Sequence, residues 1–161
     1  MKKYLLLPLL AISTLFSSQQ VEITADHFEA SDVKKVTKFI GNVHMIKGVD
    51  ELNASKVYVY FDAKKKPIKY EAIGNVKFTI TMNDGKKVYK GESGRLVYTP
   101  KTEIYELYEN VKLFDTKLDR TLIGEKVFVD KQSGKARVEG SKEKPVKFIF
   151  KIEENNASKN R

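Results

Sequence analysis

The chain has 161 residues, which suits a single domain, and its 41% hydrophobic and 11% aromatic content is sufficient for a packed interior. It contains no cysteine, which excludes disulfide bonds, a thiol nucleophile and an acylated lipoprotein cysteine. The net charge of +9 favours anionic partners such as phosphates or acidic lipid head groups. Lysine and glutamate that solvate the outer faces of strands are the alternative explanation of this charge.

Residues 1–20 have the pattern of an export signal. Lys2 and Lys3 precede an apolar run of about 13 residues, shorter than the roughly 20 that span a bilayer. We expect cleavage near residues 17–20 and a mature domain in the periplasm; a short uncleaved membrane anchor is the alternative. Loss of Lys2 and Lys3 leaves 28 basic against 21 acidic residues, a charge of +7. Nucleic acid is not an expected partner of an exported chain.

Short runs of alternating apolar and polar residues follow the signal, and each predicts a strand with one apolar face. We expect about a dozen strands of four to six residues, because no long stretch has a helical period. Alternation of this kind is typical of antiparallel hairpins with one solvated face, so the prediction is an all-β roll or sandwich over residues 21–152. Asp84-Gly85 is a strong hairpin signal. Residues 153–161 are polar and charged and predict a flexible tail.

One unit of this pattern recurs four times. The opening positions are Ala25-Asp26, Ala54-Ser55, Ser93-Gly94 and Gly124-Glu125, and the matching later positions are Gly41-Asn42, Gly74-Asn75, Glu109-Asn110 and Gly140. The two halves of a unit are 16 residues apart in three copies and 20 in the second copy. Gly-Asn pairs suit bulges or bends, because glycine tolerates positive φ. A fixed period indicates stacked units that share one continuous core.

The sequence offers no catalytic constellation, metal site or cofactor motif, so we predict a protein that is not an enzyme. His27 and His44 have no partner spacing, and we expect both to be structural or exposed. Apolar positions with period two give rows that would line the interior of a roll. These positions are Val57, Val59, Phe61, Val76, Phe78, Ile80, Leu96, Val111 and Leu113. Alone, such rows describe an ordinary core; only the repeat together with a family resemblance favours an interior that holds a ligand.

The first and last strands are predicted to be the edges of the sheet. Unpaired N–H and C=O groups at these edges can pair with another chain. The residues assigned to this interaction are Val21, Ile23, Val146, Phe148 and Phe150. We expect head-to-tail self-association, with an edge capped by the tail as the alternative. Asn53 and Asn156 are possible glycosylation sites, because each begins an Asn-Ala-Ser tripeptide and has an acid two residues before it.

The repeated units resemble those of the LptA/OstA family of lipopolysaccharide transport proteins. The resemblance rests on Gly41-Asn42-Val43, Gly74-Asn75-Val76, the variant Glu109-Asn110-Val111 and the run from Gly94 to Tyr98, and it covers about residues 21–150. It implies a single twisted, slit OstA-like β-jellyroll whose interior shields the acyl chains of lipid A. The apolar rows are then candidate lipid-binding residues.

The resemblance also implies partners. Such domains stack end to end between an inner-membrane LptC-like component and an outer-membrane LptD-like translocon. An LptC-like subunit that binds proteins more than lipid is the alternative, but LptC keeps an N-terminal membrane helix. The short apolar run of residues 4–16 favours the soluble bridge.

Overall fold

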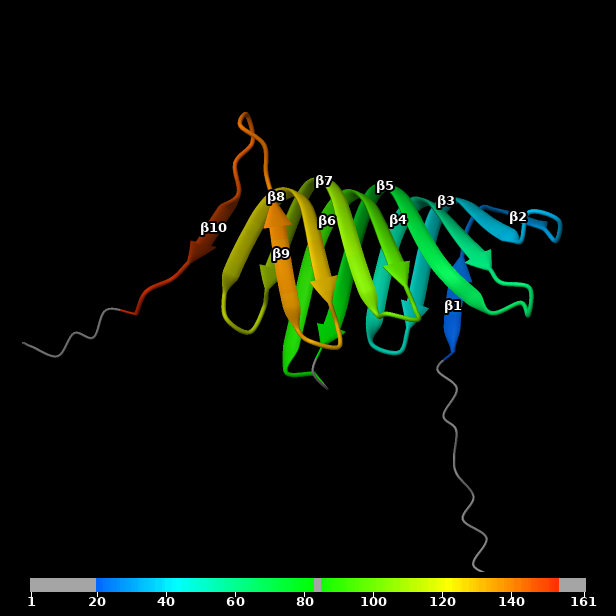
Figure 1. Cartoon of the computed structure of the whole chain (residues 1–161), viewed down its shortest axis with the longest axis horizontal. Coiled ribbons are helices and arrows are strands. Elements are labelled where there is room, and N and C mark those ends of the chain that lie inside the picture. The colour runs from blue at the N-terminus through cyan, green and yellow to red at the C-terminus, as the bar shows by residue number, and fades with distance from the viewer. Residues whose placement is uncertain (1–19, 83–84, 154–161) are drawn as a thin grey trace, which may run out of the picture.

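The protein forms one antiparallel sheet of ten strands, seen in a computed structural model that describes residues 20–82 and 85–153 (Figure 1). The strands are β1 (Val21–Thr24), β2 (His27–Ser31), β3 (Val36–Lys47), β4 (Asp50–Phe61), β5 (Pro67–Met82), β6 (Lys87–Thr99), β7 (Ile104–Asp115), β8 (Arg120–Asp130), β9 (Lys135–Glu139) and β10 (Lys147–Phe150). The order across the sheet is β1-β3-β4-β5-β6-β7-β8-β10, with β2 also on β3 and β9 also on β8. This architecture confirms the all-β prediction.

The prediction of short strands was wrong. The six central strands, β3 to β8, are 11 to 16 residues long. Each continues through the repeated positions, where the register shifts without ending the ladder. The shifts lie between Ile40 and Val43, Asn53 and Lys56, Ile73 and Val76, Glu92 and Arg95, and Tyr108 and Val111. A bulge bends a strand while pairing resumes on its other side, so two predicted strands become one.

The repeated pairs adopt the left-handed backbone that their residue types favour. Gly41 and Gly74 both have φ of 82°, and Asn42 and Asn75 follow at 45° and 47°. Glu109 and Asn110 take the same conformation, with φ of 67° and 53°, although neither is glycine. The Gly-Asn prediction of bends is therefore confirmed, and the variant pair bends the chain in the same way.

The bends line up across the sheet and divide it into two halves. Between β1 and β2 the same line passes Asp26, whose N–H donates to the carbonyl of Gly41 at 2.9 Å. Half I contains β1, β10 and residues 43–47, 50–53, 76–82, 87–92, 111–115 and 120–124. Half II contains β2, β9 and residues 36–40, 56–61, 67–73, 95–99, 104–108 and 126–130.

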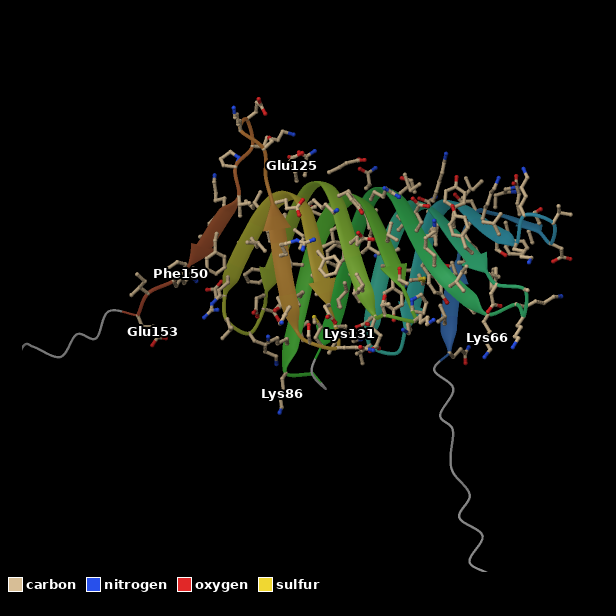
Figure 2. All side chains as sticks on the ribbon, in the orientation of Figure 1. Lys66, Lys86, Glu125, Lys131, Phe150 and Glu153 are labelled. Carbon is tan, nitrogen blue, oxygen red and sulfur yellow. The ribbon has the colours of Figure 1, made fainter. Side chains whose placement is uncertain are left out.

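The halves fold toward each other about this line and enclose the core. Opposite the bends, the turns between strands form the rim that we call the seam. Glu125, beside a bend, lies along the upper edge of the molecule in Figure 2, and Lys131, in the turn after β8, lies along the lower edge. Buried side chains from both halves form one hydrophobic cluster.

Three predicted segments lie largely or wholly outside the described residues: the export signal before Gln20, Asp84 of the hairpin, and the tail after Glu153. The strands that flank the hairpin do pair as far as Met82 and Lys87. Residues 20–82 and 85–153 hold no helix long and apolar enough to cross a membrane.

Candidate functional site

A continuous apolar row crosses the inner face of half II. Residues directly opposite each other in an antiparallel ladder point to the same face, so the register traces this row strand by strand. Its members are Phe28, Phe39, Val57, Ala72, Leu96, Leu107, Val127 and Val138. Every strand of this half contributes one apolar side chain, from β2 at one end to β9 at the other.

Half I carries a matching row. Its members are Ile23, Met45, Leu52, Phe78, Gly91, Leu113, Leu122 and Phe148. The two rows end in solvent at opposite ends of the sheet, because Phe28 is 59% exposed and Phe148 is 52% exposed. The apolar interior therefore runs the whole length of the molecule and reaches the surface at both ends.

The structure brings all nine predicted interior residues together. Eight of them are buried in the core cluster, and Phe61 is partly buried against it. Val59 and Val57 reach the core from half II, whereas Phe78 and Leu113 reach it from half I. The prediction that these side chains face inward is confirmed. Their role in lipid binding stays a prediction.

Several equally buried positions were not predicted. Leu107 and Val127 are fully buried in the half II row, and Val127 stands in the repeat where Val57 and Leu96 stand in other copies. A line of tyrosines near the seam was not predicted either. The rings of Tyr98 and Tyr105 stack with centroids 4.4 Å apart, and Tyr70 lies 6.1 Å from Tyr98. Burial raises the pKa of all three phenols, so they remain neutral at physiological pH.

The interior has little free space beneath the turn between β3 and β4. At the seam, Leu52, Phe78 and Ile80 of half I face Tyr70 and Tyr98 of half II across a cavity of about 40 Å³. A water molecule takes about 30 Å³ in the liquid. A larger cavity, of about 140 Å³, lies toward the C-terminal end of the sheet, where Leu122 and Phe148 face Val129. An acyl chain can therefore pass the smaller cavity only if the two halves move apart there.

The outer faces of the sheet are polar, and charged side chains form ion pairs on them. The carboxylate of Glu71, which is buried, accepts from Arg95 Nε at 2.6 Å and from the Tyr60 hydroxyl at 3.1 Å. The Arg95 guanidinium and Lys126 Nζ lie over the Tyr108 ring, with distances of 5.0 and 5.3 Å to its centroid. Charged residues thus cover the outer face of the sheet. This agrees with the alternative explanation of the net charge, in which lysine and glutamate solvate the outer faces of the strands.

Both histidines lie on the surface. His27 Nε2 is 3.3 Å from Glu29, and His44 Nδ1 is 2.9 Å from the side-chain oxygen of Asn53. Asn53 itself is exposed, but its strand pairs on both sides, with His44 of β3 and Lys77 of β5. Its glycosylation stays a prediction. In the described part of the chain, no three His, Asp or Glu residues are grouped to hold a metal ion.

The predicted edge strands are the two ends of the strand order. β1 pairs with β3 and places Val21 and Ile23 partly buried, while β10 pairs with β8 and is exposed along its length. Val146 lies just before β10 and is 44% exposed. The predicted edges did not include β2, which shares the first edge, because His27–Ser31 lacks apolar alternation.

Comparison with known proteins gives a consistent result. Residues 22–135 match the family model described as LptA/(LptD N-terminal domain) LPS transport protein. The fold is similar to the crystal structure of LptH, the LptA homologous periplasmic component of the lipopolysaccharide transport device from Pseudomonas aeruginosa. The TM-score is 0.73 at 19% identity, over 83% of this chain and 96% of that one. No curated protein matches the sequence.

Proposed function

The chain belongs to the LptA/LptD N-terminal domain family of lipopolysaccharide transport proteins, and from this membership we propose that it is a periplasmic bridge that shields the acyl chains of lipid A on the way from the inner to the outer membrane. One observation carries the proposal. The two inner rows are apolar from end to end and reach solvent at Phe28 and Phe148, at opposite ends of the sheet. A lipid can therefore remain out of water along the whole domain.

The energetics favour such a role without any catalytic group. Burial of an acyl chain stabilises the complex by about 0.8 kcal/mol per CH₂. Sugars and phosphates stay outside the seam, where the positive charge of the chain favours them. Because a passive groove binds lipid equally well in either direction, the energy for directed transport comes from another component of the assembly.

The ends of the sheet suit a bridge of several domains. Half I ends in β1 and β10, and the outer side of β10 has no strand partner among the described residues. Its side chains Phe148, Ile149 and Phe150 are exposed, and Phe150 is labelled at the C-terminal end of the sheet in Figure 2. Pairing of this end with the β1 and β2 end of a second domain would join the inner rows of both. We propose this contact for self-association and for the LptC-like and LptD-like partners.

Photo-crosslinking tests the proposal at single positions. A photoreactive phenylalanine derivative in place of Phe61 or Phe78 faces the interior, and the same group in place of Lys77 faces outward from the neighbouring position of β5. We expect adducts with lipopolysaccharide from the two inner positions and none from Lys77. Adducts with proteins alone would support the LptC-like interaction subunit instead. Equal lipid labelling from Lys77 would contradict an interior lipid path.

A further inference from the structure

Two polar contacts cross the seam, and both involve the turn between β3 and β4. Lys131 Nζ, from half II, lies 3.4 Å from Oδ2 of Asp50 in half I. Lys47 Nζ, from half I, donates to the hydroxyl of Tyr98 in half II at 3.2 Å and lies 4.8 Å from the centre of its ring. Among the described residues, no other side-chain hydrogen bond or ion pair joins the two halves along the seam.

The contact between Lys131 and Asp50 is held in place by its surroundings. Asp50 also accepts the backbone N–H of Thr81 at 2.7 Å through its other carboxylate oxygen. The backbone N–H of Lys131 donates to the carbonyl of Glu103 at 3.1 Å, which fixes the turn that carries the lysine. The side chains of Lys131 and Asp50 are only 25% and 14% exposed. An ion pair that is partly buried and positioned in this way loses less to solvent screening than one on the open surface.

These contacts stand directly over the interior. The same cavity of about 40 Å³ is lined by Lys47 and Asp50 at its rim and by Leu52, Phe78 and Tyr98 below. Since the interior holds no room for an acyl chain at this point, the rim above it must separate when a lipid enters here. The contacts that join the rim are then the ones that lipid entry breaks.

We propose that Lys131–Asp50 and Lys47–Tyr98 form a latch that holds the seam closed in the empty protein and opens when lipid is loaded. The proposal rests on the function proposed above and adds a moving part to it. The bend line is the hinge, because the central strands continue through it as bulges and the backbone pairing on each side is complete. The latch keeps the apolar rows out of water until a lipid replaces the contacts between them.

A reversible cross-link tests the latch. Because the chain has no cysteine of its own, Asp50→Cys with Lys131→Cys introduces a single reactive pair. A short bis-thiosulfonate cross-linker joins the two halves, and dithiothreitol releases them. With purified lipid A as the probe, we expect loading to fall at least about tenfold in the cross-linked form and to return after reduction, a change equivalent to about 1.4 kcal/mol.

The control pair lies within one half. Glu29→Cys with Lys38→Cys joins β2 to β3 at opposite residues on the outer face of half II, and its cross-link should leave loading unchanged. Undiminished loading of the Asp50 and Lys131 cross-linked form would overturn the latch and leave the proposed function standing. Failure of the unmodified chain to bind lipid A would overturn the proposed function, and the latch with it.

A second variant tests the latch without a cross-link. Lys131→Met with Tyr98→Phe removes the ion pair and the seam hydrogen bond but keeps side chains of similar size and the carboxylate that accepts Thr81. We expect lipid A to load several-fold faster, with the circular dichroism spectrum of the sheet retained. A loading rate equal to that of the unmodified chain would overturn the latch.

Discussion

The ring of Phe78 occupies the space that Gly91 leaves open on the inner face of half I. The two residues are directly opposite in β5 and β6. A Cβ added to Gly91 would lie 2.5 Å from Cζ of Phe78 and 2.6 Å from the carbonyl oxygen of Lys112. The absence of a side chain at Gly91 thus allows the Phe78 ring to lie over that position of the row.

Gly91→Ala should therefore destabilise the fold by overpacking, by about 1–3 kcal/mol in the free energy of unfolding. Urea denaturation followed by circular dichroism measures the change. Phe78→Leu in the same chain should recover only part of it, because the contact with the Lys112 carbonyl remains. Lys90→Ala, at the neighbouring outward position, is the control. An alanine variant as stable as the original would contradict this packing.

The bends should respond differently to alanine in different copies of the repeat. Gly74 has φ of 82°, so Gly74→Ala forces an L side chain into the left-handed region and against Ser55, at a cost of about 1–2 kcal/mol. Glu109 already has a side chain at φ of 67°, so Glu109→Ala should change the free energy of unfolding by less than about 0.5 kcal/mol. If both variants lost the same free energy of unfolding, the backbone conformation at the bend would not determine the cost of the substitution.

Phe148→Pro should abolish concentration-dependent oligomers. Proline removes a backbone donor and disfavours strand pairing at the exposed β10, while the core strands lie further inside the sheet. Sedimentation velocity over a range of protein concentrations measures the oligomers, and circular dichroism checks the fold. Phe148→Leu, which keeps the N–H, is the matched control and should still oligomerise. Unchanged oligomers in the folded proline variant would place the contact elsewhere.

Alkaline pH should destabilise the protein through its buried tyrosines. Burial raises the pKa of Tyr105 above its ordinary value of about 10, so above that pH the unfolded chain releases a proton that the folded chain retains. This contribution to stability is complete below about pH 10 and falls by up to about 1.4 kcal/mol per pH unit above it. Tyr105→Phe should reduce that slope, which urea denaturation between about pH 9 and 11 measures. The same slope in both proteins would contradict a neutral, buried phenol.

The sequence by itself determined the local features. Alternation with period two assigned Val59 and Phe78 to the inner face, because successive residues of a strand point to opposite sides. The Gly-Asn pairs identified the bends, because their residue types adopt positive φ at the lowest cost. These signals depend only on neighbours along the chain, and the structure bears them out.

Only the tertiary structure decided which of these local features come together. Alternation identifies an inner face but not the length of a strand, so two runs that meet at a bulge looked like two strands. It also could not show that β2 shares an edge with β1, since that pairing depends on the neighbouring strand β3 rather than on the residues of His27–Ser31. Lys131 and Asp50 are 81 residues apart and meet because the bends fold one half of the sheet over the other. The position of the seam follows from all the bends acting together, and no single stretch of the sequence encodes it.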